Sequence, residues 1–430
     1  IIMVDCGSTS NEAIDFLNQN NIKSIIIDHH EINNPYPKSN VIINPKKKVD
    51  YNNYDYLCAT TLTYFFIDIL IKKTKSDFKL SDFLILVLLA TVCDVMPLRK
   101  LNKILATNVF KNFKIEKSLA FKTIFDKFNL KRNLSIDDLG FLIGPIINAG
   151  GRLGFSNLGT EFLTSKNVNK VKTIALQLTN LNEKRKEIEK IFLDEIDFKK
   201  IKKENKDVVI YHNNKLHEGL IGIIAARLKE YFNKPSIVIT NANNLLKASA
   251  RSTPNYNIGN LIKLLINKKI IEGGGGHNMA AGFTMKKKNI KLLDSFIQDD
   301  YQRNNKDFKL SFKYDSEISS TAINLSLYNE INKLGPFGNG NFLPTFLIKN
   351  VKIIRSSQVT KNHVSAIIKP TNGASFNAIC FNCRNTEVGN YLLSYKKQIN
   401  IIAMIKKNSW NSKNNIQLNI IDLLLPVNTA

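Results

Sequence analysis

An acidic residue and two histidines follow a short run of β-branched residues near the start of the chain. Residues 25–27 are all isoleucine, which predicts a buried strand, and Asp28, His29 and His30 come directly after them. In open α/β sheets, ligands bind at the carboxyl ends of the strands. Imidazole and carboxylate groups together suit zinc, manganese or iron. The segment therefore predicts a metal site. A solvated loop could carry the same residues by chance, but a His-His pair directly after a buried strand is uncommon.

The elements that would position these side chains form a βαβ unit. Residues 1–4 predict a buried strand that ends at Asp5, residues 11–20 a helix, and residues 22–27 the second strand. Because βαβ units are right-handed and their strands parallel, Asp5 and Asp28 should leave the sheet at the same edge.

A third acidic residue, Asp94, interrupts an otherwise apolar segment at residues 91–98. Burying a carboxylate is costly unless the group is paired or bound to a metal, so Asp94 is a candidate ligand of the same site. Two alternatives stay open, because Asp94 could also cap a helix or pair with Arg99.

Arginine is rare in this chain, with nine Arg against 52 Lys. An Arg is then expected where a planar, two-pronged fork is needed, which draws attention to Arg152, Arg227 and Arg251. Arg152 lies in a glycine-rich segment at residues 144–154, which could approach a phosphate or form a tight turn between domains. Ser249 and Arg251 alternate along a predicted strand, so they point the same way and could form a phosphate fork.

Four consecutive glycines at residues 273–276 precede His277. Such a run is costly in a fold, and it suggests backbone amides that cradle a phosphate or lie flat against a substrate. The alternative is a flexible linker. That alternative is less favoured, because His277 and a predicted helix start at residues 280–282 follow at once.

The 430 residues carry a net charge of +25. This charge predicts a polyanionic partner, nucleic acid first and a membrane surface second, although the Lys-, Asn- and Ile-rich composition also fits codon bias in an AT-rich genome. The five Cys form no framework, which predicts a reducing compartment, the cytoplasm. The lone pair Cys380 and Cys383 is not expected to bind zinc. No targeting or membrane-spanning segment is expected.

The pattern of elements predicts an α/β chain in four parts. These are a parallel-sheet domain (1–165), a connecting helix (166–204), a second, smaller α/β domain (205–305) and a small β-barrel of the OB type (306–430). Residues 311–430 carry 13 Lys and Arg against 5 Asp and Glu, so this tail is basic in its own right. Most barrel aromatics belong to the core, but some could stack on bases. The candidates are Phe337, Phe342, Phe346, Phe381 and Trp410.

Taken in order, these motifs resemble the DHH phosphoesterase family, and within it the exonucleases of single-stranded DNA. Asp5 resembles the family's second motif, Asp28 to His30 the third, and Asp94 the fourth. Residues 147–154 are similar to an Asn-Ala-x-Gly-Arg element of these exonucleases. The segments 217–228, 249–252 and 275–277 resemble the DHH-associated domain, and the barrel resembles their OB domain. The resemblance covers nearly the whole chain.

The resemblance implies a role for each of these residues. Two manganese or magnesium ions would be bound by Asp5, His29 and Asp94. Asp28 would support the site, and His30 would face the scissile phosphate. The strand would be held by a further set, namely Arg152, Ser249, Arg251, Gly275, Gly276 and His277. Two cations about 4 Å apart activate a water and stabilise both the attacking and the leaving oxygen.

The implied activity is a 5′-to-3′ exonuclease of single-stranded DNA that releases mononucleotides in DNA repair and recombination. Its expected partners are single-stranded DNA, a single-strand-binding protein and a helicase, with no membrane, and it is expected to be a monomer. Two alternatives stay open: a small-nucleotide phosphodiesterase or pyrophosphatase of the same superfamily, and a non-catalytic single-strand-binding protein. The basic barrel argues against the first of these.

The sequence departs from the family in one respect. The family's first motif, His-x-Asp-x-Asp on a preceding strand, is not found, and it would lie before Ile1. Half of the carboxylates for the second metal would then be missing, and this chain alone could be inactive. Either the chain is a fragment of a longer enzyme or it is degenerate. The fragment is favoured, because the sequence opens inside a predicted strand.

Overall fold

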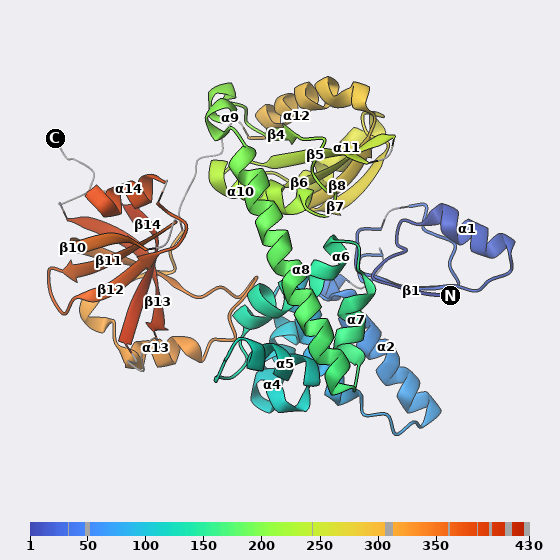
Figure 1. Cartoon of the computed structure of the whole chain (residues 1–430), viewed down its shortest axis with the longest axis horizontal. Coiled ribbons are helices and arrows are strands. Elements are labelled where there is room, and N and C mark those ends of the chain that lie inside the picture. Colours follow the sequence, from blue (N-terminus) through green and yellow to red (C-terminus); the bar gives the residue numbers. More distant parts are fainter. Residues whose placement is uncertain are drawn as a thin grey trace. The chain divides into compact units, whose positions relative to one another are not determined.

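The computed structural model describes most of the chain (Figure 1). The described residues are 1–32, 34–47, 52–242, 244–305, 313–359, 362–384, 386–394, 398–408 and 415–424. They divide into two compact units, residues 1–96 with 108–309, and residues 97–107 with 310–430. No helix among the described residues is long and apolar enough to cross a membrane.

The first unit begins with a small parallel sheet of the order β1-β2-β3, formed by Ile2–Val4, Ile25–Ile27 and Val41–Ile43. Helix α1 (Asn11–Gln19) links β1 to β2 and packs on Ile26. The predicted parallel βαβ unit is confirmed. However, β1 is not buried as predicted. The Ile2 side chain is 58% exposed, because β1 has a neighbour on only one side among the described strands.

Helices make up the next part of the chain. They are α2 (Ala59–Thr74), α3 (Leu84–Cys93), α4 (Lys100–Asn112), α5 (Leu119–Lys127), a π-helix (Asp138–Ile143), α6 (Gly144–Arg152) and α7 (Asn157–Thr164). The glycine-rich segment is therefore neither a phosphate loop nor a turn, because most of it forms α6. Gly144 serves close packing, since a Cβ there would collide with the Cys93 Sγ atom.

The connecting segment is helical, as predicted, but it holds two helices instead of one. Helix α8 (Val168–Glu195) ends at Ile196, and α9 (Phe198–Glu204) begins after Asp197, whose side chain accepts a hydrogen bond from the backbone of Lys200. The break follows from the preference of Asp for the first position before a helix. Helix α8 is not simply solvated, because it buries a stripe that includes Leu178.

The second sheet has the order β4-β5-β6-β8-β7, and its strands are Val209–His212, Ser236–Ala242, Leu245–Arg251, Ala280–Met285 and Gly273–His277. Helix α10 (Ile221–Phe232) covers one face. The other face is covered by α11 (Ile258–Asn267) and α12 (Ile290–Asn305). The glycine run is an edge strand and not a loop or linker, and the predicted helix start at 280–282 is a strand, because inward and outward residues alternate along β8.

The second unit contains the predicted OB-like barrel, which is confirmed. The sheet order is β11-β12-β14-β13-β10, and an additional pairing of β10 with β11 closes it. The strands are β10 (Thr345–Val359), β11 (His363–Pro370), β12 (Phe376–Cys380), β13 (Ile399–Asn408) and β14 (Asn415–Leu424). The short strand β9 (Ser316–Glu317) and the helices α13 (Leu325–Asn332) and α14 (Glu387–Ser394) accompany the barrel.

The candidate stacking residues of the barrel differ in exposure. Phe346 is buried in the core and Phe337 packs against it, so neither offers a free ring. The side chains of Phe342 and Phe381 are 71% and 51% exposed. Trp410 lies outside the described residues. Cys380 and Cys383 are buried free thiols, and the other three Cys are also unpaired.

Candidate metal centre

Three segments bring their polar side chains to one imidazole nitrogen. His29 Nε2 lies 3.3 Å from the Asp5 Oδ1 atom and 3.2 Å from the Asp94 Oδ2 atom. The His29 ring is buried, and its other nitrogen, Nδ1, has no hydrogen-bond partner among the described residues. Asp5, His29 and His30 also offer ligand atoms within 4.8 Å of one another. The structure thus brings together the metal ligands that the sequence predicted, although their roles stay a prediction.

The donor set and its spacing fit a divalent cation. Mg²⁺ takes ligands at about 2.1 Å in octahedral geometry, so two neighbouring ligands on one ion lie about 3.0 Å apart. The two distances at His29 Nε2 are close to this value. Carboxylate ligands suit Mg²⁺ and Mn²⁺, and imidazole suits softer transition ions. His29 Nε2 therefore lies at ligand spacing from both Asp5 and Asp94, whereas the three residues whose ligand atoms all lie within 4.8 Å of one another are Asp5, His29 and His30.

Backbone conformation places Asp5 at the edge of the sheet. Asp5 has a φ of +61° and donates its backbone N–H to the carbonyl of Ile27 at 3.0 Å. Asp is among the residues that tolerate this left-handed conformation. The turn directs the chain away from β1 just where β2 ends, which brings the Asp5 carboxylate beside His29.

Asp94 reaches the same place from the end of helix α3, where it occupies the C-cap. The turn after it is closed by two hydrogen bonds, from Val95 N to Val92 O at 3.1 Å and from Met96 N to Thr91 O at 2.9 Å. The premise that Asp94 is deeply buried is wrong, since its side chain is 47% exposed. Partial burial still raises its pKa, and the Asp5 charge adds to this while His29 opposes it.

Asp28 holds the two histidines in place. Its buried carboxylate accepts hydrogen bonds from the backbone N–H groups of Ser8 at 3.1 Å and His29 at 2.8 Å, and it lies 2.7 Å from His30 Nδ1. Burial opposes the charged form, but these hydrogen bonds outweigh it and lower the pKa of Asp28. The same contact raises the pKa of His30. Because Nδ1 is engaged, His30 is left with Nε2 for a further contact.

Asn44 is a supporting residue that the sequence reasoning missed. Its Nδ2 donates to Ser8 Oγ at 2.7 Å and to the backbone carbonyl of His30 at 2.9 Å. The available signal was the one that located Asp5 and Asp28, because Asn44 directly follows the third parallel strand and so lies at the same edge.

His277, at the end of β7, lies beside the two histidines. Its ring stacks on His30 with 5.8 Å between centroids, and it lies 6.3 Å from the His29 ring. Lys46 Nζ is 3.5 Å from His277 Nδ1 and 3.2 Å from Glu31 Oε1. Burial and the nearby Lys46 charge lower the pKa of His277. Lys46 and Glu31 carry no sequence signal, because only the fold brings them here.

A second group of residues forms a cationic fork. Arg251 Nη1 donates to Ser249 Oγ at 3.2 Å and to the backbone carbonyl of Ala250 at 2.9 Å, while Arg152 Nη1 donates to the carbonyl of Gly219 at 3.1 Å. Within the described part of the chain, no carboxylate forms an ion pair with either guanidinium. Burial lowers the pKa of both, and the charge of Arg152 lowers that of Arg251 further. Such a pair favours a bound anion.

Gly222 in the first turn of α10 makes room for this fork, and sequence reasoning did not identify it. A Cβ at this position would lie 3.0 Å from Arg251 Nη2 and 3.1 Å from Ser249 Oγ. The fork therefore lies against the N-terminal end of a helix, where backbone N–H groups also favour an anion.

The structure also shows the local contacts of Arg227 and of two glycines in β7, whose substrate-binding role stays a prediction. Arg227 is a structural residue, because its Nε lies 2.8 Å from Glu189 Oε1 and its Nη1 lies 3.1 Å from Glu230 Oε2. In the strand β7, a Cβ on Gly275 would meet nothing within 4 Å, whereas one on Gly276 would collide with Ala281. Of these two glycines, only Gly275 has open space beside it for a ligand.

Comparison with known proteins gives matches along the chain. Three family models match, namely the DHH family N-terminal domain at residues 1–91, the DHHA1 domain at 205–302 and the RecJ OB domain at 314–422. The single-stranded-DNA-specific exonuclease RecJ of Haemophilus influenzae is 27% identical over 456 residues, covering 99% of this chain and 77% of that protein. RecJ of Escherichia coli is 26% identical over 441 residues, covering 93% of this chain and 74% of that protein.

A solved structure has a similar fold. RecJ in complex with Mn²⁺ from Thermus thermophilus superimposes with a TM-score of 0.82 at 18% identity, and the match covers 99% of this chain. The chain spans 61% of the length of that solved protein. The three matched domains follow one another in the order in which the parallel sheet, the second sheet and the barrel follow one another here. We conclude that the chain carries a DHH domain, a DHHA1 domain and a RecJ OB domain.

Proposed function

We propose that this chain is the catalytic part of a metal-dependent exonuclease of single-stranded DNA. The observation that carries the proposal is that carboxylate oxygens of Asp5 and Asp94 both lie beside the Nε2 atom of His29. The fork of Arg152 and Arg251, neither of which forms an ion pair with a carboxylate among the described residues, supports it. Divalent ions supply the activated water and stabilise the charge on the phosphate oxygens.

The chain's own residues would orient the phosphodiester. Asp5, His29 and Asp94 would hold Mn²⁺ or Mg²⁺, and a second ion stays a prediction. Arg251 and Ser249 would bind a phosphate through two parallel donors. The raised pKa of His30 favours a protonated ring that can donate from Nε2 to a phosphate oxygen. Asp28 would keep that ring in the productive orientation.

The names of the relatives support one finer feature, the single-stranded substrate. The exonucleases similar to this chain are named as specific for single-stranded DNA. We infer the same substrate here, with 5′-to-3′ polarity and release of 5′-mononucleotides. A single-strand-binding protein and a helicase as partners, a monomeric state, and domain limits after residues 165, 204 and 305 belong to the same proposal.

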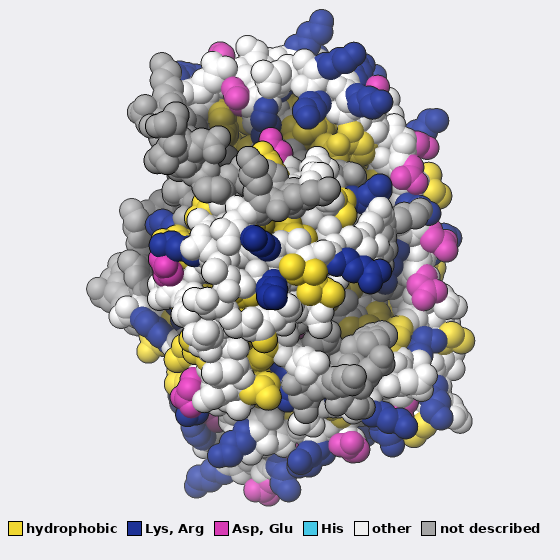
Figure 2. All heavy atoms as spheres, turned by 90° about the vertical axis from the view of Figure 1, so that its left-hand side faces the viewer, with side chains coloured by type: hydrophobic (Ala, Val, Ile, Leu, Met, Phe, Trp, Pro, Cys, Tyr) yellow, Lys and Arg dark blue, Asp and Glu magenta, His cyan; other side chains and the backbone are white. Residues whose placement is uncertain are grey.

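Charge favours a long polyanion over a small nucleotide. Lys and Arg side chains are spread over the face shown in Figure 2, and Asp and Glu side chains are sparser there. The excess of 13 basic over 5 acidic residues at 311–430 lies in a part of the chain that a small substrate would not need. A basic OB barrel suits the backbone of a single strand.

The decisive experiment combines a metal-binding readout with activity. The melting temperature of the wild type is measured with and without Mn²⁺, and hydrolysis is followed on a 5′-phosphorylated single strand. We expect Mn²⁺ to raise the melting temperature, because an ion that binds only the folded state stabilises it. Asp94→Asn should lose most of this rise and lower kcat by at least about 100-fold.

Asp82→Asn is the matched control, because Asp82 is an exposed carboxylate of the same domain that makes no ion pair with any described residue. It should behave as the wild type in both measurements. A wild-type melting temperature that does not respond to Mn²⁺, or an Asp94→Asn protein that still responds, would refute the metal assignment. Binding of single strands by a wild type whose melting temperature does not respond to Mn²⁺ would instead favour the non-catalytic alternative.

A further inference from the structure

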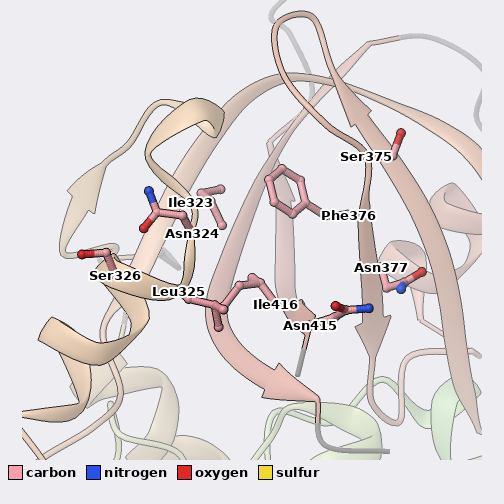
Figure 3. Close-up of a pocket in the computed structure, with 9 residues that line it drawn as sticks. All are labelled: Ile323, Asn324, Leu325, Ser326, Ser375, Phe376, Asn377, Asn415 and Ile416. Atoms are coloured by element: carbon pink, nitrogen blue, oxygen red, sulfur yellow. The ribbon is translucent and has the colours of Figure 1, made fainter. Parts of the chain in front are cut away.

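We propose that one end of the C-terminal barrel contains a pocket for a single unpaired nucleobase. A cavity of about 750 Å³ opens there between the start of α13 and the first residues of β12 and β14 (Figure 3). It is lined by Ile323, Asn324, Leu325, Ser326, Ser375, Phe376, Asn377, Asn415 and Ile416. Its volume lies within the range of about 300–1,000 Å³ that is usual for ligand pockets.

The register of two strands explains the apolar part of this pocket. Strands β12 and β14 pair in parallel with Asn377 opposite Gln417, so Phe376 and Ile416 are neighbours on the face that points into the barrel. Both side chains pack partly against the barrel core, and the ring of Phe376 projects into the cavity (Figure 3). An aromatic ring beside aliphatic groups offers a flat surface on which a base can stack.

Amides and hydroxyls make up the rest of the lining. Asn377 and Asn415 are exposed, and neither side chain takes part in a hydrogen bond within the described structure. Asn324 uses only its Oδ1 atom, which accepts a hydrogen bond from the backbone of Leu327. Each amide offers donors and an acceptor, which is the combination that reads the edge of a base.

Every described residue that lines the pocket has an uncharged side chain. A phosphate would need cationic partners, and a charged peptide would need opposite charges. A neutral group with apolar faces and a polar edge matches the lining. Among the groups of a nucleic acid strand, only the base has this character.

Two lysines lie on the adjacent strand, and one of them shares the face of the sheet that borders the pocket. In the pairing of β13 with β14, Lys407 lies opposite Ile416 and Lys406 opposite Gln417. Both lysines are exposed, and neither forms an ion pair with any described residue. Because successive side chains of a strand point to opposite faces, Lys407 shares the face of Ile416, and a nucleotide whose base enters the pocket can place a phosphate near Lys407. This neighbouring charge favours a nucleotide over an uncharged peptide.

The inference deepens the proposed function, since it rests on single strands being the ligand. It adds a position at which the presence of a base matters, in a domain where charge alone would bind every position equally. It does not depend on the metal centre, and so it can be tested without hydrolysis.

The test measures binding of the full chain to fluorescent single strands in EDTA by anisotropy. One abasic site is moved along a strand of fixed sequence. For the wild type, we expect one position at which the missing base weakens binding about tenfold. In the double variant Asn377→Ala with Asn415→Ala, this position should become equivalent to the others.

Two further variants separate the pocket from general charge. Lys406→Gln with Lys407→Gln should weaken binding at all positions alike and reduce the slope of log Kd against log salt by about 1. Asn390→Ala is the matched control, because Asn390 is an exposed amide on α14, which packs on β10 and β11 and does not line the pocket. It should retain the wild-type profile.

The proposal is overturned by an abasic penalty that is the same at every position, or by one that survives in the Asn377 and Asn415 double variant. Failure of the proposed nuclease function is a separate result, which would show as absence of Mn²⁺-dependent hydrolysis with the abasic profile intact. A wild type that binds no single strand overturns both proposals.

Discussion

Val95, next to the candidate ligand Asp94, adopts a backbone conformation that is unfavourable for its type. Its φ is +55°, and β-branched residues are rarely found in this left-handed region. The side chain is 65% exposed, so little burial offsets the strain. We expect Val95→Gly to stabilise the metal-free protein by about 1 kcal/mol, because relief of the strain exceeds the entropy that glycine adds to the unfolded chain. Urea unfolding measures this.

Asn129→Gly is a matched control for that change. Asn129 occupies the equivalent position after α5, with a φ of +51° and the same pair of hydrogen bonds, from Asn129 N to Asp126 O and from Leu130 N to Phe125 O. Asn tolerates this conformation, so its replacement should change stability by no more than about 0.5 kcal/mol. Equal effects of the two substitutions would contradict the strain at Val95.

Asp138 should make stability depend on pH. It is buried and accepts two hydrogen bonds of 2.6 Å from Arg132, and one of 2.9 Å from the backbone of Ser135. Burial opposes its charge, but these partners outweigh it and lower the pKa below the ordinary 3.8. A carboxyl whose pKa is lowered by folding stabilises the protein above its unfolded pKa. This contribution is lost as the pH falls through the folded pKa.

The test is Asp138→Asn, which should destabilise the protein by about 2 kcal/mol at neutral pH. The difference from wild type should be constant from about pH 5 to 8 and should narrow below about pH 4. Chemical unfolding at several pH values measures it. Asp137→Asn changes an exposed neighbour, and its unfolding free energy should not differ from that of the wild type in this way. If the difference in unfolding free energy between the wild type and Asp138→Asn widened in acid, the predicted direction of the pKa shift would be wrong.

Among the elements, β7 makes a sharp prediction because it consists almost entirely of glycine. A Cβ on Gly276 would collide with the backbone carbonyl of Ala280 and with Cα and Cβ of Ala281, so Gly276→Ala should destabilise the protein by about 1–3 kcal/mol. A Cβ on Gly275 has open space, so Gly275→Ala should fold normally. If the strand lies flat against substrate, Gly275→Ala should still lower kcat/KM about tenfold.

The two glycines act as controls for each other, since they are adjacent in one strand. Unfolding midpoints and kinetics on one single-stranded substrate are compared for both variants. Unchanged kinetics in a stable Gly275→Ala protein would show that β7 does not contact the substrate. The assignment of Gly275 to substrate binding would then be withdrawn.

The elements also show which parts of the site could be predicted from sequence. The edge shared by Asp5 and Asp28 followed from strand patterns and the handedness of βαβ units, and it is confirmed. Asp94 was placed near this edge by a wrong argument, since it lies at a helix end and is half exposed. The segment 144–154 was predicted to approach a phosphate or to form a turn, and this was wrong because glycine serves close packing in helices as well as contact with ligands.

Contacts between distant segments could not be predicted. Lys46 and Glu31 lie beside His277 only because the fold brings β7 to the DHH motif, and neither residue type is unusual on a surface. The sequence around Gly222 predicts an ordinary helical position and gives no sign that the Arg251 side chain packs against it. Single-sequence patterns report local preferences, and they contain no information on such pairings.

At the scale of the whole molecule, the charge of +25 predicts a dependence on substrate length and salt. A long single strand contacts more lysines than a dinucleotide does, and each contact releases counterions. We expect kcat/KM for a long strand to exceed that for a dinucleotide by at least about tenfold at low salt. This ratio should shrink between about 50 and about 200 mM salt.

Steady-state kinetics on both substrates over a salt series measures this effect. A series with an uncharged osmolyte at matched osmolarity is the control, because it changes water activity and not ionic strength. Equal rates on both substrates at every salt concentration would favour the small-nucleotide alternative over the exonuclease.

Asp5 and Asp94 come from opposite ends of a long stretch of chain, yet they lie beside the same nitrogen of His29. A cation held by all three would cross-link the two ends of this stretch. When the protein is pulled from its two ends, the segment from β1 to α3 would then lengthen only after the ligands release the ion. The metal-bound and the metal-free protein would differ in the extension at which this segment unfolds.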